Sequence, residues 1–305
     1  MLYDLNIAWS PSTTEEELLQ TLTLSSSLGY STVALNHTLT PPFPNNLTAP
    51  FPSIPSSPTS KLPNVLHRAT LPLSDPSNNY RIPFLTSIYD IIAVRPLTST
   101  AFQNACLTLD VPIISVDLTQ HLDFHFKPKP CMAAVSRGTR FEVCYSQALV
   151  ADSRGRANFI SNVKSLIRAT RGRGIMLSSE AKDALSLRAP ADVVNLLSVW
   201  GLGNEKGMQG IGEIPRSIVM NEGIKRNGFR GVINIVEVAE QEKSSNDNVD
   251  GKSSGNETGK KNKNKGQNQN QNQKRKNGEE NTQQISNRQA KKMKLAQRNA
   301  AAEKK

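Results

Sequence analysis

A chain of 305 residues is long enough to bury one large hydrophobic core and to carry an appendage beside it. Its net charge of +11 at pH 7 indicates a polyanionic partner, and no apolar run approaches the about 18 residues of a membrane span. Asp4 stands where a secretion signal would be positively charged, so we expect neither secretion nor membrane insertion. Three cysteines without metal-ligand spacing indicate buried thiols in a reducing compartment.

The start of the chain predicts a β-α-β unit. Residues 3–8 alternate as a strand does. Residues 12–27 carry Thr13 or Thr14 as an N-cap, three glutamates in the first helical turn and leucines at helical spacing. Residues 31–35 form a second apolar strand, and such a unit predicts neighbouring parallel strands.

Similar patterns alternate along the rest of the foldable chain. Further strands are expected at residues 65–73, 88–94, 111–116, 175–177 and 232–236. Helices are expected at residues 98–109, 155–170, 179–187, 191–200 and 214–226. Seven or eight β-α units with strands that are apolar throughout favour a TIM-barrel-like α/β barrel over an open doubly wound sheet.

Two segments interrupt or end this pattern. Residues 40–63 hold eight prolines among serines and threonines, which predicts a mobile surface loop inserted into a domain of residues 1–239. Residues 240–305 are rich in Asn, Gln, Lys and Ser and predict a disordered basic tail. Basic clusters at 274–276 and 291–294 have the spacing of a two-part nuclear import signal, with a merely solvated tail as the alternative.

Two arginines lie between two apolar runs. The runs cover residues 132–135 and 141–145, and Gly138 allows a tight backbone excursion between Arg137 and Arg140. A guanidinium binds phosphate through a fixed fork of donors, so this pair suggests an anionic target. A solvated loop between two core strands is the alternative interpretation.

Basic residues are concentrated between residues 127 and 173. This segment holds ten lysines and arginines against two acidic residues, whereas residues 1–126 are net acidic. A basic region inside the foldable chain indicates a folded polyanion-binding surface, and its few aromatic residues favour recognition of RNA backbone and shape. The residues predicted to bind RNA are Arg137, Arg140, Arg154, Arg156, Arg171 and Arg173. The sequence leaves open whether they share one end of a barrel.

Residues suited to metal catalysis are few. The candidates are Asp4, His37, Asp117, His121 and His125. No regular spacing of carboxylates and histidines joins them into a metal centre. The glycines between residues 201 and 212 follow a helix and lack a completing Lys-Ser/Thr, so they predict a helix cap and a flexible connection instead of a phosphate loop. We therefore predict no catalytic residue and no metal ligand.

Six motifs occur in order along the chain. They are VALNHTL (33–39), IYDIIAVRP (88–96), LDVPIISVDL (109–118), VSRGTRFEVCYSQAL (135–149), GIMLSSEA (174–181) and LRAPADVVNLLSVWGL (187–202). In this order they resemble the thirty-kilodalton protein subunit family of ribonuclease P and ribonuclease MRP. The most specific are RGTRFEVCYS and the Arg-x-Pro-x-Asp-Val run at 188–193, and the resemblance covers about residues 1–238.

The resemblance implies a TIM-barrel-like fold related to the polymerase and histidinol phosphatase group of metal-dependent phosphoesterases. Where that group carries a His-x-His pair, this chain has Asn6 and Ala8, so the metal set is eroded. The implied role is a non-catalytic scaffold without a cofactor of its own, while the RNA subunit uses Mg²⁺. The alternative is a metal-dependent phosphoesterase with a reduced metal site that uses Asp4, His37 and Asp117.

The resemblance also implies partners and a location. The partners are the ribonuclease P or MRP RNA, precursor tRNA, a small α/β protein subunit and other ribonuclease P proteins, with no membrane. The processes are removal of the precursor-tRNA 5′ leader and rRNA processing in the nucleus, specifically the nucleolus. Arg137 and Arg140 lie in the most specific motif and, with Arg171 and Arg173, are the expected RNA contacts. The proline-rich insert and the glycine-rich segment depart from the family pattern, so the sequence does not identify the surface that binds the protein partner.

Overall fold

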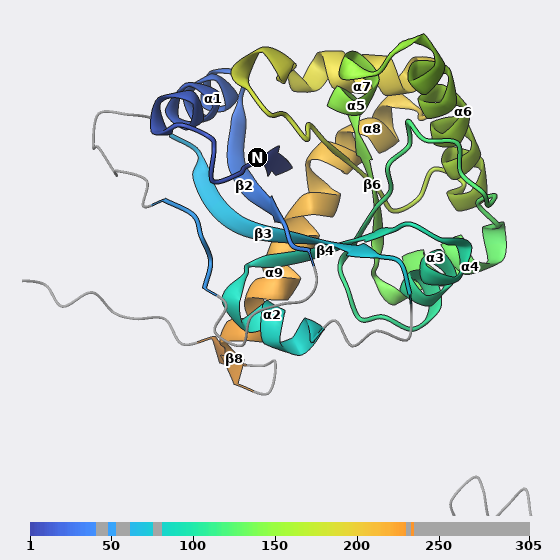
Figure 1. The fold of residues 1–305 in the computed structure, drawn as a ribbon, viewed down its shortest axis with the longest axis horizontal. Helices are drawn as coiled ribbons and strands as arrows, with labels where there is room; N and C mark the ends of the chain where they lie inside the picture. Colours follow the sequence, from blue (N-terminus) through green and yellow to red (C-terminus); the bar gives the residue numbers. More distant parts are fainter. Residues whose placement is uncertain (41–47, 53–61, 76–80, 230–232, 235–305) are drawn as a thin grey trace, which may run out of the picture. The chain divides into compact units, whose positions relative to one another are not determined.

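Seven parallel strands form the centre of the fold. The computed structural model describes residues 1–40, 48–52, 62–75, 81–229 and 233–234. The strands pair in chain order, each parallel to the next (Figure 1). They are β1 (Leu2–Ala8), β2 (Tyr30–Thr38), β3 (Asn64–Leu73), β4 (Ile91–Pro96), β5 (Ile113–Ser115), β6 (Arg140–Cys144) and β7 (Ile175–Ser178).

The sheet closes on itself into a barrel. The segment that follows β7 runs beside β1, where the Glu180 amide donates to the Asn6 carbonyl at 2.7 Å. The Ala8 amide donates to the Ala181 carbonyl at 2.9 Å, and Ile7 and Ala181 form a parallel bridge. These contacts join the first and last strands. The predicted TIM-barrel-like architecture is confirmed, with seven strands.

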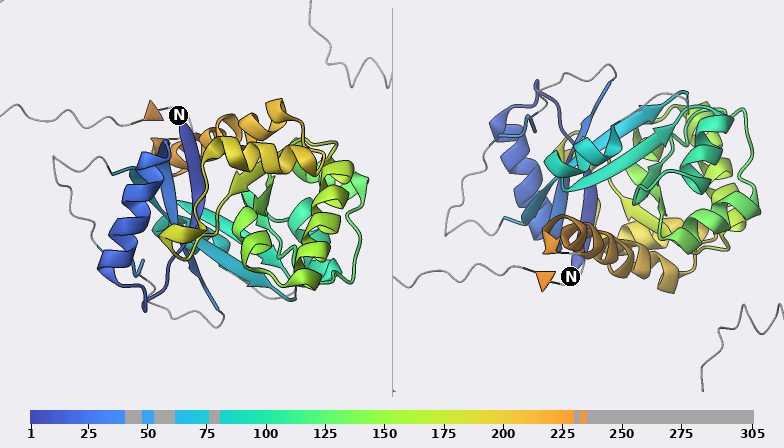
Figure 2. Two further views of the ribbon diagram at one scale, coloured as in Figure 1. Left: turned by 90° about the horizontal axis from the view of Figure 1, so that it is seen from above. Right: turned by 90° about the horizontal axis from the view of Figure 1, so that it is seen from below.

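Helices surround the strands, as the two views in Figure 2 show. They are α1 (Glu15–Ser27), α2 (Ile82–Ile88), α3 (Ser99–Leu107), α4 (Pro128–Arg137), α5 (Tyr145–Val150), α6 (Ser153–Thr170), η1 (Ala184–Ser186), α7 (Pro190–Val199), α8 (Asn204–Ile211) and α9 (Glu213–Asn227). A capping box starts α1, because the Thr14 hydroxyl accepts from the Glu17 amide and the Glu17 carboxylate accepts from the Thr14 amide. Of the two residues predicted as the N-cap, Thr13 and Thr14, the structure has Thr14.

The core has an outer and an inner layer. The outer layer lies between strands and helices and includes fully buried Leu22, Leu35 and Phe159. The inner layer lies inside the barrel, where Leu5 and Met176 pack with Ile218 of α9. Helix α9 therefore covers the amino-terminal end of the barrel. Ion pairs between Arg226 and Asp90 and between Lys225 and Asp110 tie α9 to the loops before β4 and β5.

One apolar run forms a helix that the strand-like sequence pattern conceals, and the strand predicted at residues 88–94 begins later, as β4. Residues 132–135 belong to α4, which ends at Gly138 in the left-handed conformation (φ 94°), so the alternative interpretation of two core strands is wrong for this run, whereas the run after Arg140 does form β6. Residues 88–94 divide between the end of α2 and strand β4, because Tyr89 ends the helix. Short helices with prolines in the first turn give little periodic signal.

Three further predictions need correction. The glycine-rich segment contains helix α8 rather than a flexible connection. Residues 179–187 contain only the short turn η1, because 180 and 181 are extended against β1. In the predicted strand 232–236 the structure describes β9 (Ile233–Asn234), which pairs antiparallel with β8 (Gly228–Phe229) outside the barrel.

Parts of the predicted insert and the whole predicted tail lie outside the described residues. Within the insert, residues 48–52 are described, and the Phe51 ring stacks on His67 with centroids 4.5 Å apart. Residues 240–305 are not among those described, so the domain boundary at 239 stays a prediction. The three cysteines are buried and free, as expected, and burial raises the pKa of Cys131 to about 12. No described helix is long and apolar enough to cross a membrane.

Close packing of α8 gives the first prediction. A Cβ atom added at Gly210 would lie 2.9 Å from the Ile175 carbonyl oxygen of β7, whereas one added at Gly223 in α9 would meet nothing within 4 Å. Gly210→Ala should therefore lower the free energy of unfolding by about 1–3 kcal/mol. Gly223→Ala should raise it by about 0.5–1 kcal/mol, because alanine favours the helix. Urea unfolding of both variants measures these changes. If both substitutions changed the free energy of unfolding by the same amount in the same direction, the close packing of α8 would be contradicted.

Candidate functional site

A buried ion pair crosses the barrel interior. Arg68 on β3 and Glu142 on β6 form two parallel hydrogen bonds, Nη1 to Oε1 at 2.5 Å and Nη2 to Oε2 at 2.7 Å. Both side chains are completely buried. Burial alone would raise the pKa of Glu142, but the Arg68 charge and hydrogen bonds lower it to about 2. The pair therefore stays ionised, in the two-point geometry that guanidinium and carboxylate favour.

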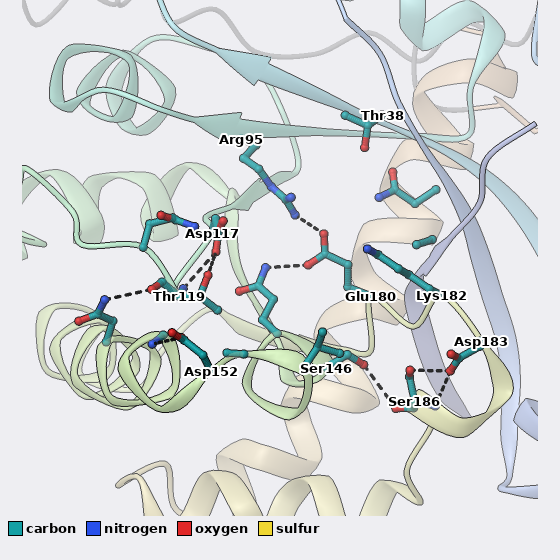
Figure 3. Close-up of a pocket in the computed structure, with 18 of the residues that line it drawn as sticks. Thr38, Arg95, Asp117, Thr119, Ser146, Asp152, Glu180, Lys182, Asp183 and Ser186 are labelled. Carbon is teal, nitrogen blue, oxygen red and sulfur yellow. Dashed lines mark hydrogen bonds and ion pairs between the residues drawn. The ribbon is translucent and has the colours of Figure 1, made fainter. Parts of the chain in front are cut away.

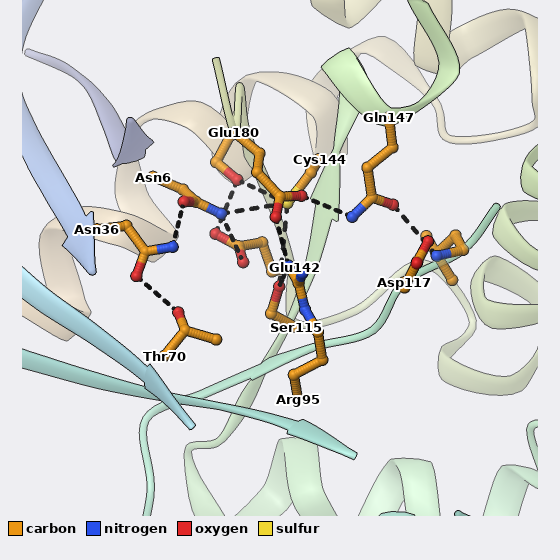
Figure 4. A network of polar contacts seen from close by, with 12 residues as sticks. Asn6, Asn36, Thr70, Arg95, Ser115, Asp117, Glu142, Cys144, Gln147 and Glu180 are labelled. Carbon is orange, nitrogen blue, oxygen red and sulfur yellow. Dashed lines mark hydrogen bonds and ion pairs between the residues drawn. The ribbon is translucent and has the colours of Figure 1, made fainter. Parts of the chain in front are cut away.

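Polar neighbours complete the coordination of this pair (Figure 4). The Asn6 amide donates to Glu142 Oε2 at 3.3 Å, and the Ser178 hydroxyl donates to Oε1 at 2.7 Å. Arg68 Nη1 also donates to the Leu5 carbonyl at 2.6 Å. An irregularity in the pairing of β1 with β2 between residues 4 and 7 lets β1 present both the Leu5 carbonyl and the Asn6 side chain to the pair.

This interior does not fit a metal centre. The guanidinium of Arg68 already places a positive charge beside the interior carboxylate, and its neighbours include amides such as Asn36, bonded to Asn6 at 2.8 Å. The Cys144 thiol lies in the same layer, and burial raises its pKa, which keeps it protonated. The side chain of Asp4 bonds to the Ser179 amide, and His37 packs edge-on to Trp9. Among the described residues, no three His, Cys, Asp or Glu side chains are grouped as metal ligands.

A cavity of about 810 Å³ opens above this layer (Figure 3). Its lining comes from the last residues of β1, β2 and β4 and from the segments that follow β1, β5, β6 and β7, which together form the carboxyl-terminal end of the barrel. Active and binding sites of TIM barrels lie at this end, because the strand-to-helix loops converge there. Of the five candidate metal ligands, Asp117 and His121 line this cavity.

A chain of hydrogen bonds forms the cavity floor. Arg95 Nη2 donates to Glu180 Oε1 at 2.6 Å, and Gln147 Nε2 donates to Glu180 Oε2 at 2.6 Å. The Leu118 amide in turn donates to Gln147 Oε1 at 3.1 Å. Glu180 holds its place with a left-handed backbone (φ 56°), which costs energy in a residue other than glycine. Strand β4, helix α5 and the two segments that follow β5 and β7 are thus fixed relative to one another.

The six arginines predicted to bind RNA are divided between the two ends of the barrel. Arg154 and Arg156 are in the first turn of α6, at the carboxyl-terminal end, and Arg154 lines the cavity. Arg140 begins β6, and Arg171 and Arg173 precede β7, so these three are at the amino-terminal end. The structure therefore does not bring the six together into one site.

Three of these arginines have structural contacts, since Arg140 Nη1 donates to the Val135 carbonyl at 3.4 Å and the other two bind carbonyls as well. Arg137 donates to the carbonyls of Cys106 at 2.8 Å and Leu109 at 2.5 Å, where it binds the carboxyl-terminal end of α3. Arg156 donates to the carbonyls of Ala148 at 3.1 Å and Ala151 at 3.2 Å. Their guanidinium groups are therefore partly engaged, whereas Arg154, Arg171 and Arg173 are exposed.

Sequence reasoning missed the interior pair and the cavity floor. Arg68, Glu142 and Arg95 each stand within apolar strand sequences, and a charged residue in a buried strand needs a partner. That signal marks them as buried ionic residues. It does not reveal which residues pair, because the partners are 74 positions apart for Arg68 and Glu142 and 85 apart for Arg95 and Glu180.

The structure is a closed parallel barrel with a polar cavity at its carboxyl-terminal end and an ion pair inside, which defines a TIM-barrel-like protein. The family model for the RNase P subunit p30 matches residues 1–227. The probable ribonuclease P protein subunit 3 of Schizosaccharomyces pombe is 34% identical over 235 residues, which cover 77% of this chain and 99% of that protein. The ribonuclease P protein subunit p30 of Mus musculus is 31% identical over 220 residues, covering 68% and 81%.

A solved structure shares the fold. A chain in the cryo-EM structure of archaeal ribonuclease P with mature tRNA superimposes with a TM-score of 0.58 at 15% identity, covering 79% of this chain and all of that one. The chain described here belongs to the RNase P subunit p30 family. The family resemblance of the six sequence motifs is thereby confirmed.

The ion pair gives the second prediction. Arg68→Leu leaves Glu142 buried without its charge partner, so we expect a loss of about 3–5 kcal/mol in the free energy of unfolding. The double variant Arg68→Leu/Glu142→Leu removes both charges and should lose less than the single variant. Denaturant unfolding of the two variants and of Glu142→Leu measures the coupling. If the loss in the free energy of unfolding of the double variant equalled the sum of the losses of the two single variants, the two residues would not be coupled.

The third prediction concerns Asp4. Burial raises the pKa of its carboxyl from 3.8 to about 6, although hydrogen bonds from Ser179 and Asn6 act against this. The folded state therefore holds this proton more tightly than the unfolded state. Its contribution to stability is complete below pH 3.8 and is lost as the pH rises through 6.

Asp4→Asn should remove this dependence. Relative to the wild type, the variant should gain on the order of 3 kcal/mol between pH 4 and pH 7. Thermal or urea unfolding over this pH range measures the gain, with Asp123→Asn, an exposed position, as the control. If the stability of Asp4→Asn changed with pH in parallel with that of the wild type, Asp4 would have an ordinary pKa.

Proposed function

We propose that the chain is a non-catalytic protein subunit of ribonuclease P and ribonuclease MRP. In this role it binds the catalytic RNA and partner proteins and supports removal of the precursor-tRNA 5′ leader and rRNA processing. Family membership supports the complex, since relatives are named as ribonuclease P and ribonuclease P/MRP subunits. The observation that supports a non-catalytic role is the Arg68–Glu142 pair, which occupies the barrel interior with a fixed positive charge.

The remaining parts of the proposal concern cofactors, partners and location. The chain takes no cofactor, and the Mg²⁺ needed for cleavage is bound by the RNA subunit. The partners are the RNA, precursor tRNA, a small α/β protein subunit and other ribonuclease P proteins. The chain works in the nucleus, specifically in the nucleolus. The basic clusters at 274–276 and 291–294, outside the described residues, support import.

An RNA-binding surface fits best at the amino-terminal end of the barrel. We call the exposed residues Arg168, Arg171, Arg173 and Lys206 the lower basic patch. The Lys206 ammonium donates to the Arg171 carbonyl at 2.7 Å, which brings α8 against the end of α6. None of the three arginine side chains has a hydrogen-bond or ion-pair partner among the described residues, so their guanidinium groups are available for phosphates.

The fourth prediction tests this patch. Binding of the full-length chain to ribonuclease P RNA should weaken steeply with salt, since phosphate contacts release counterions. Arg171→Ala/Arg173→Ala should weaken binding and reduce the slope of log K against log salt by about two. A filter-binding or fluorescence-anisotropy titration over a salt series measures both quantities.

Matched variants distinguish a specific RNA site at the lower basic patch from a general effect of net charge on RNA binding. Lys127→Ala/Lys129→Ala removes the same net charge from exposed residues at the other end of the barrel and should leave the slope nearly unchanged. Arg171→Lys/Arg173→Lys should retain most of the slope. If the two alanine pairs weaken binding equally, the lower basic patch is not the RNA site. If the wild type shows no salt-dependent RNA binding, the proposed function fails.

A further inference from the structure

We call the cavity at the carboxyl-terminal end of the barrel the barrel mouth. Several charged side chains that line it make no contact that stabilises the fold. Lys182 and Arg154 line the cavity, and neither side chain forms a hydrogen bond or ion pair with another described residue. Asp117 uses only Oδ1, which accepts from the Thr119 amide at 3.1 Å and the Thr119 hydroxyl at 2.6 Å. Asp152 and Asp183 line the cavity too and likewise accept hydrogen bonds only through Oδ1. The cavity therefore offers two unengaged cations and three carboxylates that each keep one oxygen free.

We propose that the barrel mouth binds one unpaired nucleotide of an RNA strand. In this arrangement Lys182 and Arg154 bind the phosphate, and Asp117 accepts a hydrogen bond from a ribose hydroxyl. The inference rests on the proposed function, because it takes RNA as the partner. It concerns the carboxyl-terminal end of the barrel, whereas the lower basic patch is at the amino-terminal end.

The cavity has a fixed polar floor. Glu180 is held on one side by Arg95 and on the other by Gln147, so its carboxylate is fully engaged (Figure 3). Asn36 is likewise engaged, because its amide donates to Asn6 and accepts from the Thr70 hydroxyl at 2.7 Å. A floor fixed in this way needs no rearrangement on binding, which lowers the entropic cost.

The positive charge for a phosphate comes from side chains. The amino terminus of α6 borders the cavity, but the Asp152 carboxylate already accepts from the Gly155 amide at 2.7 Å. Arg156 turns away to the carbonyls of α5. Arg154 and Lys182 therefore remain as the anion-binding groups on this wall, and Lys182 extends its ammonium into the cavity in Figure 3.

An aromatic wall is available for a base. Trp9 follows β1, lines the cavity and is half-buried. His37 packs edge-on to its ring at a centroid distance of 5.8 Å, and Phe51 lies at 5.0 Å, so the indole is held in place. Stacking of a base on an aromatic ring is tolerant of sequence. Thr38, also in the lining, offers a hydroxyl for the base edge.

The size of the cavity agrees with such a ligand. A volume of about 810 Å³ falls in the range of about 300–1,000 Å³ that small-ligand pockets show. The cavity opens at the end of the barrel, so the neighbouring nucleotides of a strand can leave it. A free mononucleotide has the same chemistry as one unit of RNA, and the experiment distinguishes the two sources.

The fifth prediction uses the full-length chain with hexauridylate, uridine 5′-monophosphate and inorganic phosphate as probes. Hexauridylate should quench the fluorescence of Trp9 and saturate, and Trp9→Phe should abolish this quenching, since the other tryptophan, Trp200, is buried. Lys182→Ala and Arg154→Ala should each raise the Kd about tenfold, the usual effect of losing one charged hydrogen bond. Lys164→Ala, exposed on α6 and outside the cavity, should bind as the wild type does.

The ribose contact has its own readout. The wild type should bind the 2′-deoxy hexamer more weakly than hexauridylate, and Asp117→Asn should reduce this difference. Hexamers with 4-thiouridine should cross-link to residues that line the cavity. Circular dichroism of each variant confirms that it is folded, so a change in Kd reports on the site.

Three outcomes would overturn the inference. Wild-type affinity in both Lys182→Ala and Arg154→Ala would show that the mouth is not the site. Binding of uridine 5′-monophosphate but not of hexauridylate would assign the cavity to a free nucleotide. Loss of hexamer binding in Arg171→Ala/Arg173→Ala alone would place single-strand binding at the lower basic patch. That last result would leave the proposed function intact, whereas absence of all RNA binding would remove both.

Discussion

The Arg68–Glu142 ion pair is the interaction on which the interior of the barrel depends. Both side chains are fully buried, so each would be strongly destabilising alone. Their bonds to Leu5, Asn6 and Ser178 connect β1, β3, β6 and β7 across the barrel axis. Because a guanidinium already occupies this layer, a divalent cation would meet a like charge there. One interaction thus holds opposite strands together and accounts for an interior unsuited to metal.

Closure of the barrel with seven strands depends on the segment after β7. Residues 179–181 run beside β1, and the Asp4 carboxylate accepts from the Ser179 amide at 3.0 Å, in addition to the backbone bonds. Glu180 belongs to the same segment and carries the cavity floor. The strained backbone of Glu180 therefore serves both the closure and the site. The geometry of the mouth follows from how the barrel closes.

The two ends of the barrel have different chemistry. At the amino-terminal end, α9 covers the interior with Ile218, and exposed arginines surround the loops that enter β7. At the carboxyl-terminal end, the interior continues into an open polar cavity with charges of both signs. A surface rich in arginine suits the phosphate backbone of a folded RNA, whereas a concave polar site suits one small group. The structure thus separates two kinds of recognition that share a single barrel.

The sequence by itself determined the α/β pattern, the buried cysteines, a helix cap at Thr13 or Thr14 and the family, because these depend on local periodicity, side-chain chemistry and ordered motifs. It could not reveal helices α4 and α8, since prolines and glycines obscure helical periodicity in short segments. Only the tertiary structure decided that Arg154 and Arg171 are at opposite ends, although they are close in sequence, because one helix of 18 residues carries the chain from one end of the barrel to the other. The pairing of Arg68 with Glu142 was also decided there, since strands distant in sequence meet only when the barrel closes.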